Sequence, residues 1–107
     1  MKLADIDFSK YRKIRNRLVL GKGEYCFIGA CAKELGLEVD AHSIKDSEGK
    51  NRSVEDVLAS FSELENYPDM TALAARIIVM NDGSEMTLSE IQGEILYGTE
   101  YQSEYCT

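Results

Sequence analysis

Cys26, His42 and Asn81 are the residues whose types and order in this sequence could support catalysis. Cys26 stands three residues after a glycine, where a helix-forming stretch begins in GEYCFIGACAKELGL (residues 23–37). A helix N-terminus together with a nearby imidazolium lowers the pKa of a thiol and makes it nucleophilic. His42 is the single histidine, and Asn81 or Asp82 could orient it. The chain order cysteine, histidine, asparagine is that of papain-like enzymes, so a cysteine-dependent enzyme is one hypothesis.

The competing interpretation places Cys26 in the hydrophobic core. Cysteine is among the most buried residue types, and a short helical chain offers neither a strand platform nor an obvious oxyanion hole. Cys26 and Cys31 are five residues apart, without the second pair of cysteines or histidines that a zinc site needs. We therefore expect Cys26 to pack, and we expect a protein that is not an enzyme, with no metal site and no cofactor.

Length and composition indicate one folded domain. The chain has 107 residues, 44% of them apolar and 29% charged. It contains no apolar run of the roughly 20 residues that cross a bilayer, and its first residues lack the apolar stretch of a signal peptide. Three cysteines form no disulfide framework. These properties predict a cytoplasmic protein with reduced thiols and no membrane partner.

The net charge of −7 is distributed unevenly along the chain. Residues 1–53 carry 11 of the 12 basic side chains, whereas residues 54–107 carry 11 acidic side chains and the single cation Arg76. A partner selected by charge would suit this polarity, and two copies could also pair through opposite charges as a homodimer. Because the domain as a whole is acidic, direct binding of nucleic acid is not expected.

Hydrophobic periodicity predicts an all-α fold. Apolar residues recur at helical spacing in most of the chain, and glycines or polar turns separate the segments. The β-branched run 77–79 would also suit a short strand, but no nearby segment would pair with it. We expect an irregular bundle of about five helices with one long loop (37–52), a single helical domain at 1–96, and an acidic, tyrosine-containing C-terminal tail at 97–107. The predicted helical segments are 7–20, 25–35, 53–64, 69–80 and 87–96.

Capping patterns mark several of the predicted helix ends. Ser53 with Asp56, and Thr87 with Glu90, have the spacing of reciprocal capping boxes at helix starts. Gly36 has the position of a left-handed residue after a helix end.

Two short stretches, CFIGACAKELG and ARIIVMNDGSEMTLSEIQGEI, carry a resemblance that covers roughly residues 18–96. Here the chain resembles a family of small uncharacterised helical domains of bacteria and their phages. The resemblance implies a helical fold and no mechanism. Physically, small residues would let the second predicted helix approach the fourth, and Asn-Asp would satisfy orphan groups where one helix ends and the next begins. The motif residues are Cys26, Gly29, Ala30, Asn81, Asp82, Thr87 and Ile91.

The function expected from these observations is that of a small acidic binding protein, encoded by a phage or another mobile element. It would modulate or inhibit a host protein, such as a nucleic-acid-handling or defence protein, through charge complementarity in the host cytoplasm. One form of this hypothesis is a nucleic-acid mimic whose carboxylates imitate phosphates. The expected partner-binding residues are Glu85, Glu90, Glu94, Glu100, Tyr101, Glu104 and Tyr105. The alternatives are the cysteine-dependent enzyme and a housekeeping protein with no specific partner.

Overall fold

The computed structural model describes residues 1–105, with side chains described through residue 98. This part of the chain forms an α/β fold with four α-helices and two small β-sheets. The all-α bundle predicted from the sequence is therefore wrong. None of the helices in the described residues is both long and apolar enough to span a membrane.

All the strands among residues 1–105 lie in the first half of the chain, with one α-helix between the third strand and the fourth. That half begins with 3-10 turns at Leu3–Asp5 (η1) and Phe8–Lys10 (η2). The strands are β1 (Arg12–Lys13), β2 (Val19–Gly21), β3 (Glu24–Tyr25), β4 (Glu38–Val39) and β5 (Ile44–Lys45). The helices are α1 (Phe27–Glu34), α2 (Val54–Ala59), α3 (Met70–Gly83) and α4 (Leu88–Tyr105).

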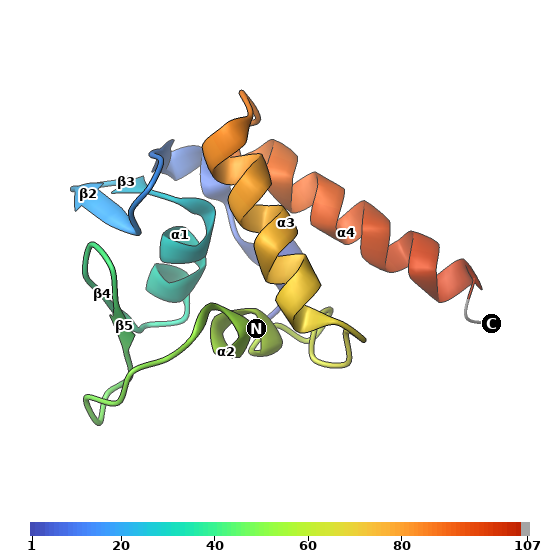
Figure 1. Ribbon diagram of the computed structural model, residues 1–107, viewed down its shortest axis with the longest axis horizontal. Helices are drawn as coiled ribbons and strands as arrows, with labels where there is room; N and C mark the ends of the chain where they lie inside the picture. Colours follow the sequence, from blue (N-terminus) through green and yellow to red (C-terminus); the bar gives the residue numbers. More distant parts are fainter. Residues whose placement is uncertain (106–107) are drawn as a thin grey trace.

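Both sheets are small and flank α1 (Figure 1). The first sheet has the strand order β1-β3-β2, with β1 parallel and β2 antiparallel to β3. The second is the antiparallel pair β4-β5. Helix α1 contacts β3, β4 and α2, while α3 contacts α2 and α4. Helix α1 therefore lies where the two sheets and the helical layer meet.

The segment 7–20 is not the predicted helix. Its backbone is drawn into the first sheet, where Arg12 N donates to Gly23 O at 2.8 Å and Ile14 N donates to Tyr25 O at 3.2 Å. Asn16 then takes a positive φ of 65°, which a continuing right-handed helix does not allow. Intrinsic helix periodicity is a weak preference, and the backbone partners supplied by β3 outweigh it here.

The predicted long loop 37–52 contains the β4-β5 hairpin. Leu18 N donates to Ala41 O at 2.8 Å and ties the hairpin turn to the chain entering β2. Beyond β5, the Asp46 carboxylate accepts from Glu48 N at 2.9 Å and from Lys50 N at 3.0 Å. These side-chain acceptors order a turn that has too few apolar residues to show a strand period.

The later predicted helices are present, with shifted ends. The β-branched run 77–79 lies inside α3, which continues to Gly83. Helix α4 continues through residue 98 to Tyr105. Both predicted capping boxes are confirmed, with Asp56 N to Ser53 Oγ at 3.1 Å and Glu90 N to Thr87 Oγ1 at 3.1 Å. The left-handed conformation predicted for Gly36 is confirmed by its φ of 80°.

The core forms around α1. Phe8 and Phe27 stack with ring centroids 4.8 Å apart, which anchors η2 on the first turn of the helix. Gly29 allows a close approach, because a Cβ at this position would lie 2.1 Å from Leu18 O. The small residue therefore accommodates the chain that enters β2. The prediction that Gly29 lets the second predicted helix approach the fourth is wrong, because the neighbour that its missing side chain accommodates is Leu18.

Candidate ligand pocket

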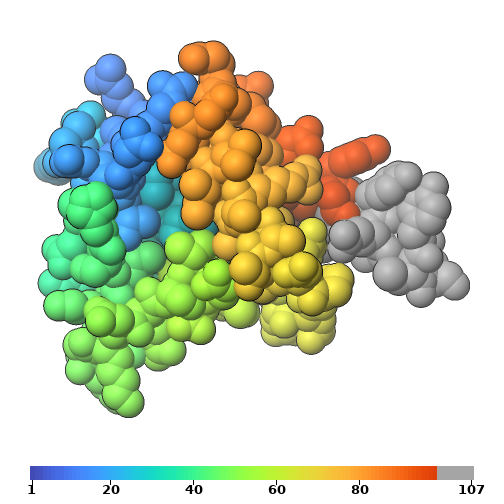
Figure 2. Space-filling model, in the orientation of Figure 1, coloured from blue at the N-terminus to red at the C-terminus, as the bar shows by residue number. Residues whose placement is uncertain are grey.

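A pocket of about 550 Å3 lies beside the N-terminus of α1. Its walls come from the β4-β5 turn, the start of α2, the C-terminal half of α3 and the chain that enters β2. Figure 2 shows the teal atoms of α1 recessed between the green hairpin and the orange face of α3. Four segments that are distant in sequence therefore converge on one hollow.

The candidate catalytic residues all line this pocket. Cys26 lies at its base, His42 comes from the β4-β5 turn, and Asn81 and Asp82 come from α3. Sequence order alone suggested that these residues could form a constellation, and the fold brings them to the same cavity. Whether they form a catalytic set depends on the hydrogen bonds that each side chain makes.

Cys26 is the N-cap residue of α1 and is only 9% exposed. Its Sγ accepts a hydrogen bond from Gly29 N at 3.3 Å. Burial raises the pKa of the Cys26 thiol, although hydrogen bonds from the amides of Gly29 and Ile28 act in the opposite direction. Cys26 is therefore a buried thiol that caps the N-terminus of α1.

Asn81 is buried, with 3% exposure, and links three segments. Its Oδ1 accepts from Phe27 N at 2.9 Å, and its Nδ2 donates to Ile14 O at 2.8 Å and to Asp82 Oδ1 at 2.8 Å. Both amide hydrogens are therefore in use. The sequence predicted that Asn81 satisfies orphan groups at the corner between α3 and the next helix, whereas its side-chain oxygen satisfies the first amide of α1.

His42 is exposed at the mouth of the pocket. Among residues 1–98, no hydrogen bond joins the His42 imidazole to the Cys26 thiol or to the Asn81 amide, whose bonds lead elsewhere. Asp82 Oδ1 accepts from Asn16 N at 3.1 Å in addition to the bond from Asn81. The four side chains share a cavity without forming a hydrogen-bonded relay.

Two arginines at the pocket were missed by the sequence analysis. Arg17 and Arg52 line the cavity, and both are exposed. Arg52 Nη2 lies 2.9 Å from Asp46 Oδ2, whereas the Arg17 guanidinium has no ion-pair partner within residues 1–98. No sequence signal pointed to them, because they lie 35 positions apart in segments assigned to a helix and a loop. The apolar wall is formed by Leu18, Ile44, Val54, Ile77 and Ile78.

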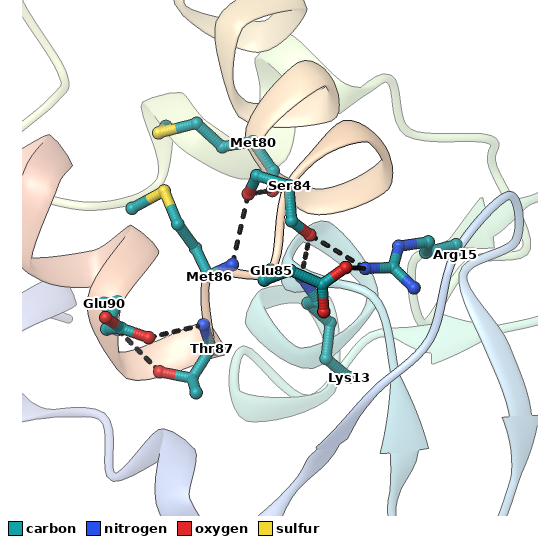
Figure 3. Close-up of polar contacts among 8 residues, drawn as sticks. All are labelled: Lys13, Arg15, Met80, Ser84, Glu85, Met86, Thr87 and Glu90. Atoms are coloured by element: carbon teal, nitrogen blue, oxygen red, sulfur yellow. Dashed lines mark hydrogen bonds and ion pairs between the residues drawn. The ribbon is translucent and has the colours of Figure 1, made fainter.

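The predicted acidic surface is partly occupied by internal contacts (Figure 3). Glu85 pairs with Arg15 at 3.4 Å, and Glu94 pairs with Arg76 at 3.4 Å. Glu90 is used in the capping box of α4, where its Oε1 accepts from Thr87 N at 2.9 Å. The partner-binding role of this surface stays a prediction. Fewer of its carboxylates are free of internal contacts than the sequence suggested. The predicted residues Glu100, Tyr101, Glu104 and Tyr105 lie outside the described side chains.

The basic N-terminal segment contacts the C-terminal end of α3, beside Glu85. Lys13 Nζ and Arg15 Nη2 donate to Ser84 O at 2.9 Å and 2.8 Å, as Figure 3 shows. Cations at a helix C-terminus interact favourably with its dipole and its orphan carbonyls. Part of the positive charge of residues 1–53 is therefore used within the molecule.

Metal binding has no support within the described residues, since no three histidine, cysteine or carboxylate side chains gather closely enough to hold an ion. Comparison of the chain with protein-family models, curated proteins and solved structures gave no match. The resemblance noted in the sequence, including its motif residue Ala30, therefore stays a prediction. The fold and the pocket are the basis for any statement about function.

Proposed function

We propose that this protein is a non-enzymatic binding domain whose pocket beside the N-terminus of α1 holds a small ligand. One observation carries the proposal: a cavity of about 550 Å3 joins an apolar wall to a few convergent polar side chains. Ligand sites in proteins typically have volumes of about 300–1,000 Å3 and this mixture of surfaces. Cys26 and Cys31 are both free thiols, which supports the cytoplasm as the compartment.

The polar contacts favour binding over catalysis. Burial raises the pKa of the Cys26 thiol, so its nucleophilic form is disfavoured near neutral pH. Asn81 donates both amide hydrogens to other groups, and its Oδ1 accepts from Phe27 N and so holds α1 in place. These residues give the pocket a rigid base, which reduces the ordering cost when a ligand enters.

The test uses octanol as a neutral apolar probe and amide chemical shifts as the readout. Ile78 lines the pocket, whereas its neighbour Val79 is 67% exposed and does not. We expect octanol to shift amides around the cavity in the wild type and in Val79→Trp, and to lose this effect in Ile78→Trp. Shifts scattered over the surface, or equal in both variants, would contradict the proposal.

A second candidate is the cysteine-dependent enzyme, favoured by the finding that Cys26 and His42 line one cavity. It requires a Cys26 thiol that reacts with iodoacetamide well below about pH 8.5, the usual thiol pKa. A Cys106→Ser background removes the cysteine outside the described residues, and Cys26→Ser is the blank. A thiol that stays unreactive near neutral pH in the folded protein rules this candidate out.

A further inference from the structure

We propose that the ligand of this pocket is an amphipathic carboxylate, with an apolar chain inside the cavity and an anionic group at the arginine-lined mouth. This inference rests on the proposed function and adds the chemical class of the ligand. It is carried by the charges and the apolar surface that line the cavity, which differ from those of the molecule as a whole.

The cationic side chains at the mouth are Arg17 and Arg52. Arg17 is exposed and has no ion-pair partner within residues 1–98, so its guanidinium is available to a ligand. Arg52 is held by Asp46 at 2.9 Å, and Asp46 is itself fixed by backbone amides in the following turn. A guanidinium carries five N–H donors, so one ion pair leaves Arg52 able to bind a second carboxylate.

The negative charge in the pocket is limited to Asp82. Its Oδ1 already accepts hydrogen bonds from Asn16 N and Asn81 Nδ2, which orient it within the protein. Counting Asp46, which pairs with Arg52, two guanidinium groups and two carboxylates lie at or beside the pocket, in a protein whose net charge is −7. The pocket is therefore less negative than the molecule as a whole, and the guanidinium of Arg17, which has no ion-pair partner within residues 1–98, favours an anion over a neutral or cationic head group.

The interior of the cavity suits a hydrocarbon chain. Ile77 is fully buried beneath it, and Ile78 is 46% exposed at its edge. Leu18, Ile44 and Val54 complete an apolar wall on the opposite elements. Burying a methylene group against such a wall contributes about 0.8 kcal/mol, so chain length and affinity should rise together.

Three probes with the same apolar chain separate the head-group preference from the pocket itself: octanoate, octanol and octylamine. Titrations followed by amide chemical shifts should give the tightest binding for octanoate. The variant Arg17→Gln should weaken octanoate binding about tenfold, the effect of losing a charge-assisted hydrogen bond, and leave octanol binding unchanged. Arg12→Gln is the matched control, because it removes the same charge from an exposed residue that does not line the pocket.

Each outcome distinguishes the two proposals. Equal binding of octanoate and octanol would overturn the anionic ligand and leave the pocket as a binding site. Equal weakening by Arg12→Gln would also overturn it, since only the net charge would then matter. Failure of all three probes to perturb the cavity would overturn the proposed function together with this inference.

Discussion

Asn81 Oδ1 accepts a hydrogen bond from Phe27 N at 2.9 Å, so a side chain of α3 satisfies the first amide of α1. The first amides of a helix have no partner within it. Through Nδ2, the same side chain also holds Ile14 O at 2.8 Å. One buried amide therefore joins the N-terminal segment, the pocket base and α3.

Removing this amide should destabilise the protein. Asn81→Ala leaves Phe27 N and Ile14 O without their partners, and an orphaned buried polar group costs about 1–3 kcal/mol. We expect a loss of about 2–4 kcal/mol, measured by urea unfolding. The control Asn66→Ala changes an exposed turn residue and should stay within about 0.5 kcal/mol. Similar losses in the two variants would show that Asn81 does not link these segments.

Adding a methyl group at Gly29 should be strongly destabilising. The new Cβ would lie 2.1 Å from Leu18 O and 2.9 Å from Leu18 C, and backbone atoms cannot move aside as a flexible side chain can. We expect Gly29→Ala to cost about 3 kcal/mol or to prevent folding.

Gly93→Ala is the matched control for this substitution. Gly93 lies in α4 with open space around its Cβ position, so alanine there should raise stability by about 1 kcal/mol through helix propensity. Thermal unfolding of both variants compares them directly. If Gly29→Ala behaved like Gly93→Ala, the close approach of α1 to Leu18 would be wrong.

The contact between Tyr11 and Glu34 should make stability depend on pH. Tyr11 Oη donates to Glu34 Oε2, and this bond lowers the pKa of the Glu34 carboxyl from 4.5. A lowered folded-state pKa stabilises the protein above the unfolded-state pKa, and this contribution is lost as pH falls through the folded-state value. Urea unfolding of Tyr11→Phe should show a loss of about 1.5–3 kcal/mol near pH 7.

That loss should shrink as the pH falls below about 4.5, because protonation weakens the same bond in the wild type. Tyr67→Phe is the control, since Tyr67 makes no side-chain hydrogen bond among those found within residues 1–98. A deficit for Tyr11→Phe that stayed constant down to acid pH would contradict the role of the ionised Glu34.

The capping role of Cys26 changes what substitutions there should do. A buried hydroxyl without a hydrogen-bond partner would cost about 1–3 kcal/mol at this position. Because Gly29 N supplies a partner and serine is a favoured N-cap residue, Cys26→Ser should stay within about 1 kcal/mol of the wild type. Cys26→Ala removes the acceptor and should cost about 1–2 kcal/mol in urea unfolding. A serine variant less stable than the alanine variant would show that the cap contributes nothing.

Local sequence determined the features that depend on neighbouring residues. The capping boxes at Ser53 and Thr87 and the left-handed Gly36 follow from side-chain or backbone preferences within a few positions. The helices after residue 53 likewise follow from their apolar period. In each case the partners are close in the chain, so their spacing is visible in the sequence.

Tertiary structure decided the features that depend on distant partners. Residues 7–20 have a helical period, yet the backbone of β3 draws them into a sheet whose strands are only two or three residues long. Strands this short show no period of their own. The pocket arises in the same way, because Arg17, His42, Arg52 and Asn81 meet only after the hairpin and α3 pack around α1. Such contacts depend on the free energy of the whole fold, and the spacing of residues within a short segment does not reveal them.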